Sequence, residues 1–158
     1  MPDPQIPSLK DFAGTTLLNA EGKPVSLADF VGQRTLIFFF PKAGTTGCTA
    51  QACGFRDSFP KIQEHGATVI GISPDAPKAL AKWRAKENLP YVLLSDPDHR
   101  VAEKFGVWGE RSMYGRKFMG IIRSHFVFDA NGNVVEAKIK VSPADSVEKG
   151  VQSLFENK

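Results

Sequence analysis

The two cysteines of this sequence, Cys48 and Cys53, are the residues best suited to covalent chemistry. They lie in a stretch whose apolar residues recur with helical periodicity. The buried stripe predicted by this periodicity consists of Cys48, Ala52, Phe55, Phe59 and Ile62. Cys48 should therefore open a helix, where free N–H groups and the helix dipole favour a thiolate, the nucleophilic form of cysteine. Taken alone, Cys48 also fits a small buried hydrophobe, and Cys53 an inert thiol.

The C-x-x-x-x-C spacing does not suit a disulfide within a regular helix. In such a helix the two Cα atoms are ~8.6 Å apart, about 140° around the axis, whereas a disulfide needs Cα atoms within about 7 Å. Joining Cys48 to Cys53 would thus require the first turns to unwind. Gly54 lowers helix propensity, and Pro60 should kink or end the helix nearby. We therefore expect this segment to be locally unstable.

Strands and helices alternate along the chain and must position these cysteines. Residues 35–40 are apolar without alternation, which is typical of a central strand covered on both faces, and Pro41 should end it. We expect further strands at 67–73, 91–94, 123–128 and 134–140, helices at 76–87 and 99–105 and after Ser142, and a hairpin from 14–18 and 23–26. Asp75 is the expected N-cap of the second helix. The pattern predicts an α/β fold in which helices flank a central mixed β-sheet.

Length and composition exclude several classes of protein. At 158 residues, the chain fits one domain spanning 1–158. Its 20 Lys and Arg and 17 Asp and Glu are scattered and give a net charge of +3, so we expect neither nucleic acid nor a membrane surface as a partner. The N-terminus lacks the features of a signal peptide, and no apolar run could span a membrane. We therefore expect a cytoplasmic protein, in which a close cysteine pair is redox-active or metal-binding.

The segment around Cys48 resembles the peroxiredoxins. Pro41, Thr45 and Cys48 form their P-x-x-x-T-x-x-C motif, and Cys53 is placed like the resolving cysteine of the bacterioferritin comigratory protein, or peroxiredoxin Q, subfamily. Similar segments follow in order at residues 55–57, 71–75, 89–91, 93–97 and 105–108 and at Arg123. The resemblance implies a thioredoxin-like fold with an N-terminal β-hairpin extension. It also implies thiol peroxidase activity on hydrogen peroxide and organic hydroperoxides, with thioredoxin or glutaredoxin as reductant and no metal or organic cofactor.

The same resemblance assigns roles to five residues. Cys48 would be the peroxidatic cysteine and Cys53 the resolving cysteine, joined during turnover by an intramolecular disulfide. Thr45 would place its hydroxyl against the peroxide and the thiolate, and Pro41 would shield the thiolate from water. Arg123 would supply guanidinium donors to the sulfur and to the peroxide oxygens.

Some features differ from what is common among relatives. Thr46 stands where many have proline, and Gln51 where many have glutamate. The sequence also lacks the Gly-Gly-Leu-Gly and C-terminal Tyr-Phe stretches that resemble features of dimeric, peroxide-sensitive peroxiredoxins. We therefore expect a monomer that is relatively resistant to sulfinic acid formation.

Three other functions fit parts of the pattern. A thioredoxin-like dithiol–disulfide oxidoreductase would share the fold, but its reactive pair is normally C-x-x-C. A structural zinc site needs four ligands, whereas the two cysteines and three histidines lack paired metal-ligand spacing. A redox-inert binding module would require both thiols to be unreactive. The histidines favour structural roles, with His125 as a polar residue at a strand end.

Overall fold

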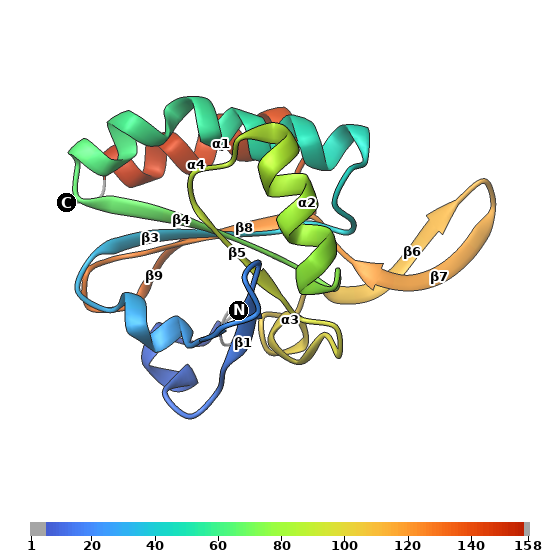
Figure 1. Cartoon of the computed structure of the whole chain (residues 1–158), viewed down its shortest axis with the longest axis horizontal. Coiled ribbons are helices and arrows are strands. Elements are labelled where there is room, and N and C mark those ends of the chain that lie inside the picture. The colour runs from blue at the N-terminus through green and yellow to red at the C-terminus, as the bar shows by residue number, and fades with distance from the viewer. Residues whose placement is uncertain (1–5, 157–158) are drawn as a thin grey trace, which may run out of the picture.

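A mixed β-sheet forms the centre of the computed structural model, which describes residues 6–156 (Figure 1). Over that range the sheet has seven strands in the order β2-β1-β5-β4-β3-β8-β9. The strands are β1 (Leu17–Asn19), β2 (Pro24–Val25), β3 (Arg34–Phe39), β4 (Ala67–Ser73), β5 (Val92–Ser95), β8 (Ser124–Phe128) and β9 (Val134–Ile139). Strand β4 is parallel to β3 and β5, whereas β8 is antiparallel to both β3 and β9. This confirms the predicted mixed sheet.

Helices cover both faces of the sheet. They are α1 (Thr46–Glu64), α2 (Pro77–Glu87), α3 (Arg100–Lys104) and α4 (Pro143–Glu156), with short 3-10 helices η1 (Leu9–Phe12) and η2 (Leu27–Phe30). Helices α1, α2 and α4 contribute to the hydrophobic cluster on one face, and α3, η1 and η2 to the cluster on the other. Figure 1 shows α1 and α4 lying side by side along the sheet. Within residues 6–156, no helix is both long and apolar enough to cross a bilayer.

The packing of strand β3 on both faces explains why residues 35–40 are apolar without alternation. Leu36 and Phe38 belong to the cluster beneath α1, while Ile37 and Phe39 belong to the opposite cluster. All four are 0% exposed, and burying side chains of this size contributes about 1.5–3 kcal/mol each. The end of β3 is thereby a rigid support for the loop that leads into α1.

The N-terminal hairpin is part of the main sheet. Strand β1 pairs antiparallel with β2 and also with β5. The predicted hairpin is confirmed, and its attachment to β5 shows that it extends the sheet edge.

Two helix ends can be compared with the expectations. Helix α1 continues past Pro60 to Glu64, so the proline does not itself end the helix. The proline ring is exposed, its fixed φ is compatible with a helix, and buried Phe59 and Ile62 hold the helix to the sheet on either side of it. The N-cap of α2 is Ala76 rather than Asp75. The Asp75 carboxylate instead accepts hydrogen bonds from the Ala43 N–H and the Ser73 hydroxyl, both at 2.7 Å, and so fixes the loop before α1.

A second hairpin, which the sequence analysis did not anticipate, projects from the main body (Figure 1). It consists of β6 (Trp108–Met113) and β7 (Arg116–Ile121), which pair antiparallel. Its turn residues, Tyr114 and Gly115, have φ values of 52° and 78°, the left-handed conformation that two-residue hairpin turns require. Buried Ile121 anchors the hairpin in the second hydrophobic cluster.

Candidate active site

Cys48 lies in the first turn of α1, as its position in the sequence predicts. Its side chain is 0% exposed and belongs to the hydrophobic cluster under α1. Thr45 is the N-cap residue, in extended conformation, and its hydroxyl donates to the Lys42 carbonyl at 2.9 Å. The loop between β3 and α1 turns at Gly44, whose φ of 85° suits glycine. Strand, loop and helix together place the sulfur at the positive end of the α1 dipole.

Arg123 is far from Cys48 in the sequence, but the fold brings its guanidinium against the cysteine. It directly precedes β8, and its Nη1 lies 3.5 Å from the Cys48 Sγ and 2.9 Å from the Gln51 Oε1. A Cβ added to Gly47 would lie only 2.9 Å from the Arg123 Nη2. Glycine at position 47 therefore lets the guanidinium pack closely on the start of α1.

A pocket of about 480 Å³ opens beside this arrangement. Pro41, Thr45, Gly47 and Arg123 line one side of it. The β6–β7 hairpin supplies the other side through Trp108, Arg111, Phe118, Met119, Gly120 and Ile121. The structure thus brings four of the five predicted site residues together, with Cys48 buried against Arg123.

Cys53 lies elsewhere on α1, toward α2. Its thiol is partly buried and donates a hydrogen bond to the Glu87 carboxylate at 3.6 Å, while both cysteines are free thiols. Burial raises the pKa of Cys53, and the hydrogen bond and charge of Glu87 add to this effect, while the Arg56 charge opposes it. Helix α1 is continuous from Thr46 to Glu64. The Cα atoms of Cys48 and Cys53 are therefore ~8.6 Å apart in this structure, too far for a disulfide.

Two aromatic residues hold the helical turns between the cysteines. The Trp83 indole N–H donates to the Thr49 hydroxyl at 3.3 Å, and the Tyr91 hydroxyl donates to the Ala52 carbonyl at 2.6 Å. Both aromatic side chains are buried in the cluster under α1. Any unwinding of these turns must break both contacts.

Comparison with known proteins identifies the family and the fold. The model of the AhpC/TSA family matches residues 8–137. The chain belongs to this family. Peroxiredoxin Bcp of Escherichia coli strain K12 is 49% identical over 119 residues, which cover 75% of this chain and 76% of that protein. The protein is therefore a thiol peroxidase of the Bcp and peroxiredoxin Q subfamily of peroxiredoxins.

Solved structures agree over nearly the whole peroxiredoxin chain. Peroxiredoxin Q of Xanthomonas campestris superposes with a TM-score of 0.89 at 29% identity, covering 99% of both chains. The bacterioferritin comigratory protein of the same organism, solved in a study of its alkyl peroxide reduction, gives a TM-score of 0.87 at 29% identity over 97% of this chain and 98% of that one. These matches confirm the thioredoxin-like fold with N-terminal hairpin strands.

His125 of this peroxiredoxin is a polar residue near the start of β8, as the sequence analysis expected, and the fold buries it. It lies within β8, is 0% exposed, and contacts the Ser146 hydroxyl at 2.9 Å and the Glu136 carboxylate at 2.7 Å. Burial lowers the pKa of His125, although the hydrogen bond and charge of Glu136 act in the opposite direction. His125 is buried because α4 covers this end of β8.

The other histidines have local structural contacts. His65 bonds to the Lys61 carbonyl at the end of α1, and His99 bonds to Glu103 and stacks on Trp108. Over the part of the chain that the structure describes, no group of three or more His, Cys, Asp or Glu residues is arranged to hold a metal ion.

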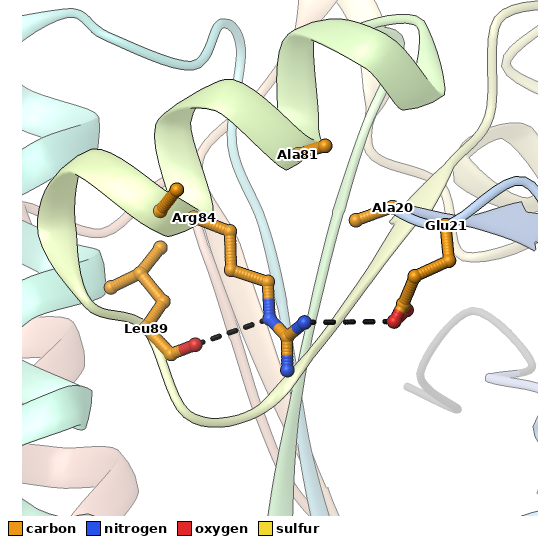
Figure 2. Close-up of a pocket in the computed structure, with 6 residues that line it drawn as sticks. Ala20, Glu21, Ala81, Arg84 and Leu89 are labelled. Atoms are coloured by element: carbon orange, nitrogen blue, oxygen red, sulfur yellow. Dashed lines mark hydrogen bonds and ion pairs between the residues drawn. The ribbon is translucent and has the colours of Figure 1, made fainter.

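A shallow pocket of about 280 Å³ lies apart from the peroxiredoxin site, beside α2 (Figure 2). Its lining includes Arg84, which donates to the Leu89 carbonyl at 3.1 Å and lies 3.7 Å from the Glu21 carboxylate. These two contacts of Arg84 hold α2 against the β1–β2 turn. None of the predicted site residues lines this pocket.

Sequence reasoning missed three contributors to the site. Gln51 is buried one helical turn after Cys48, and a polar residue beside the apolar stripe is the signal that could have found it. Glu87 contacts Cys53 from the end of α2, and Phe118 reaches the pocket from the β6–β7 hairpin. The contacts of Glu87 and Phe118 depend on tertiary packing, so no local sequence pattern predicts them.

Proposed function

We propose that this enzyme reduces hydrogen peroxide and organic hydroperoxides with Cys48 as the peroxidatic cysteine and Cys53 as the resolving cysteine. Thioredoxin or glutaredoxin then reduces the resulting disulfide, and the enzyme works as a monomer in the cytoplasm. The observation that carries the proposal is the Arg123 guanidinium, 3.5 Å from a buried sulfur at the N-terminus of α1. Positive charge and free N–H groups at that place stabilise a thiolate.

The first step is attack of the Cys48 thiolate on the terminal peroxide oxygen. The S–O bond forms as the O–O bond breaks, leaving a sulfenic acid, and the departing oxygen takes a proton to leave as water or an alcohol. Negative charge moves from sulfur to the departing oxygen during this step. The guanidinium donors of Arg123 are placed to follow that charge because they line the pocket and contact the sulfur.

Thr45 and Pro41 complete the proposed peroxide site. The Thr45 hydroxyl proton is directed to the Lys42 carbonyl, which leaves the oxygen lone pairs to accept the O–H of a peroxide. The Pro41 ring lines the same pocket and has no N–H to hold water there. Thr45 is thus placed to orient a peroxide, and Pro41 to keep water from the sulfur.

The second step is attack of the Cys53 sulfur on the Cys48 sulfenic acid. An S–S bond forms, the S–O bond breaks, and the hydroxide takes up a proton to leave as water. Because the wound helix keeps the two Cα atoms ~8.6 Å apart, the early turns of α1 must unwind first. Catalysis therefore includes a conformational step.

A dithiol protein suits this role, since its two thiols can return the disulfide to two thiols by thiol exchange. The cytoplasm keeps such proteins reduced, which supports that compartment. We do not propose a dithiol–disulfide oxidoreductase activity, because the chain is a peroxiredoxin and its cysteines have four residues between them within one helix. Alkyl peroxide reduction by the Xanthomonas campestris relative supports organic hydroperoxides as substrates.

The deciding experiment follows the consumption of hydrogen peroxide and cumene hydroperoxide in an assay coupled to NADPH, thioredoxin reductase and thioredoxin. We expect the wild type to turn over and Cys48→Ser to be inactive. Cys53→Ser should consume one equivalent of peroxide without being recycled by thioredoxin. Activity in Cys48→Ser, or insulin reduction by a wild type that ignores peroxide, would overturn the proposal. Sedimentation of the reduced and oxidised enzyme tests the monomer.

A further inference from the structure

A line of buried hydrogen bonds leads from Arg123 away from Cys48 and through the protein. The Arg123 Nη1 donates to the Gln51 Oε1 at 2.9 Å, and the Gln51 Nε2 donates to the Ser146 hydroxyl at 2.9 Å. The Ser146 hydroxyl meets the His125 Nδ1 at 2.9 Å, and the His125 Nε2 meets the Glu136 carboxylate at 2.7 Å. Gln51, Ser146 and His125 are each 0% exposed. The line therefore connects α1, α4, β8 and β9 without access to solvent until Glu136.

The direction of every hydrogen bond in this line is determined by its two ends. A guanidinium can only donate, so Gln51 must turn its oxygen toward Arg123, and an ionised Glu136 can only accept. His125 then carries its proton on Nε2, which leaves Nδ1 to accept the Ser146 proton. The Ser146 oxygen, in turn, accepts from the Gln51 amide. Each donor finds an acceptor only when His125 is neutral in this tautomer.

We propose that Ser146 and His125 are positioning residues for the peroxidase reaction, which hold Gln51 with its oxygen toward Arg123 and thereby keep the guanidinium beside the Cys48 sulfur. The inference rests on the proposed roles of Cys48 and Arg123. A glutamine side chain needs such support because its two faces differ. Rotated by half a turn, the amide would present N–H donors to a guanidinium that has only donors.

Arg123 depends on this support for its placement. Its long side chain has many rotamers, so contacts on both sides are needed to hold it. Gly47 supplies the contact on one side, where an added Cβ would come within 2.9 Å of the guanidinium, and Gln51 supplies the hydrogen bond on the other. Losing the Gln51 contact lets the guanidinium leave the sulfur.

The charges around His125 agree with a neutral ring. Glu136 and Lys138 face it from β9, Lys138 as its partner in the strand register. From α4 the ring contacts Ser146, and its register partner on β3 is the neutral Phe38. Burial and the Lys138 charge both lower the pKa of His125, against the opposing effect of Glu136. A doubly protonated ring would donate an N–H to Ser146 and reverse the hydrogen bond between these two residues.

The test compares two replacements of His125 in the full-length reduced enzyme. His125→Asn keeps an acceptor near the place of Nδ1, whereas His125→Leu fills similar space without one. We measure the second-order rate constant for Cys48 oxidation by hydrogen peroxide in single-turnover mixing experiments. His125→Leu and Ser146→Ala should each lower it about fivefold, the effect expected for loss of one hydrogen bond between neutral groups. His125→Asn should stay within twofold of wild type.

Further variants separate positioning from packing. Ser153→Ala, another buried serine of α4, is the matched control and should leave the rate unchanged. In a Gln51→Glu background, both carboxylate oxygens accept, so Ser146→Ala should no longer lower the rate. Equal losses in His125→Leu and His125→Asn, or an undiminished effect of Ser146→Ala beside Gln51→Glu, would overturn the proposal. So would wild-type rates in both His125→Leu and Ser146→Ala.

These outcomes are distinct from a failure of the proposed function. If Cys48→Ser remains active, the assignment of the nucleophile fails, whatever the His125 variants do. If Cys48→Ser is inactive while His125→Leu and Ser146→Ala react like wild type, only the positioning role fails. Should His125→Leu not fold, Ser146→Ala with and without Gln51→Glu decides the question alone.

Discussion

Replacing Ala50 with glycine should accelerate formation of the disulfide between Cys48 and Cys53. Ala50 lies between the two cysteines and is exposed, so its methyl group affects helix conformation more than packing. The disulfide can form only after these turns unwind, because the wound helix keeps the Cα atoms ~8.6 Å apart. Glycine favours the unwound state, since its backbone loses more freedom on entering a helix.

The size of the effect follows from helix propensity. Glycine is about 0.8–1.0 kcal/mol less favourable than alanine inside a helix, which changes a local unwinding equilibrium about fivefold. If unwinding precedes the attack of Cys53, the rate constant for disulfide formation should rise by up to that factor. Oxidation of Cys48 uses the wound helix with Arg123 beside the sulfur. Its rate should change less than about twofold, because the wound form still predominates.

The assay mixes reduced enzyme with one equivalent of hydrogen peroxide and follows tryptophan fluorescence. Trp83 reports on the relevant turns, because its indole N–H is bonded to the Thr49 hydroxyl at 3.3 Å. Acid-quenched samples analysed by mass spectrometry distinguish sulfenic acid from disulfide. The matched control is Ala81→Gly, which carries the same helix penalty at an exposed position in the middle of α2.

An unchanged rate of disulfide formation in Ala50→Gly would refute the unwinding argument. Equal acceleration in Ala81→Gly would refute it too, because the effect would then reflect general destabilisation rather than the turns between the cysteines. Acceleration confined to Ala50→Gly, with peroxide oxidation unaffected, is the expected outcome.

Three further predictions concern the surroundings of the two cysteines and the buried histidine. Glu87→Gln should lower the pKa of Cys53, because the contributions of Glu87 to raising it are lost; in a Cys48→Ser background, iodoacetamide should then alkylate Cys53 at lower pH, and Arg56→Gln should shift the profile in the opposite direction. Gly47→Ala should slow peroxide oxidation of Cys48 about tenfold by displacing a charged hydrogen-bond donor, since its Cβ would lie 2.9 Å from the Arg123 guanidinium, whereas Gly14→Ala, with open space around it, should not; equal rates in the two variants would contradict this. Burial lowers the pKa of His125 in the folded protein, so the unfolded chain protonates this imidazole at a higher pH than the folded protein does. The free energy of unfolding should therefore decline as the pH falls below about 6.5. His125→Asn should show a shallower decline in denaturant titrations at pH 5 to 8, and an identical slope would argue against a buried neutral ring.

Much of the fold was predictable because the relevant signals are local. The apolar run at 35–40 and the strand at 67–73 are buried on both faces, so their composition alone indicates central strands. The placement of Cys48 followed from the helical stripe beginning at that residue. The family motif then added Thr45 and Arg123, which the structure places around the same pocket.

The remaining features depend on packing that a sequence pattern does not record. The β6–β7 hairpin projects from the body, so its residues follow no core-facing alternation, and Phe118 is 41% exposed. Asp75 fits an N-cap by sequence, but the nearby Ala43 N–H and Ser73 hydroxyl compete for its carboxylate. His125 falls on the expected strand, but only the position of α4 shows that it is buried.

The projecting hairpin also gives this enzyme a way to diversify. Phe118 and Met119 form part of the pocket wall, yet they are 41% and 55% exposed and lie outside both hydrophobic clusters. Substitutions there can change which peroxides fit without altering the support of Cys48 or the stability of the sheet. Substrate selectivity can therefore evolve, or be engineered by changing these exposed hairpin residues, on a catalytic body that stays the same.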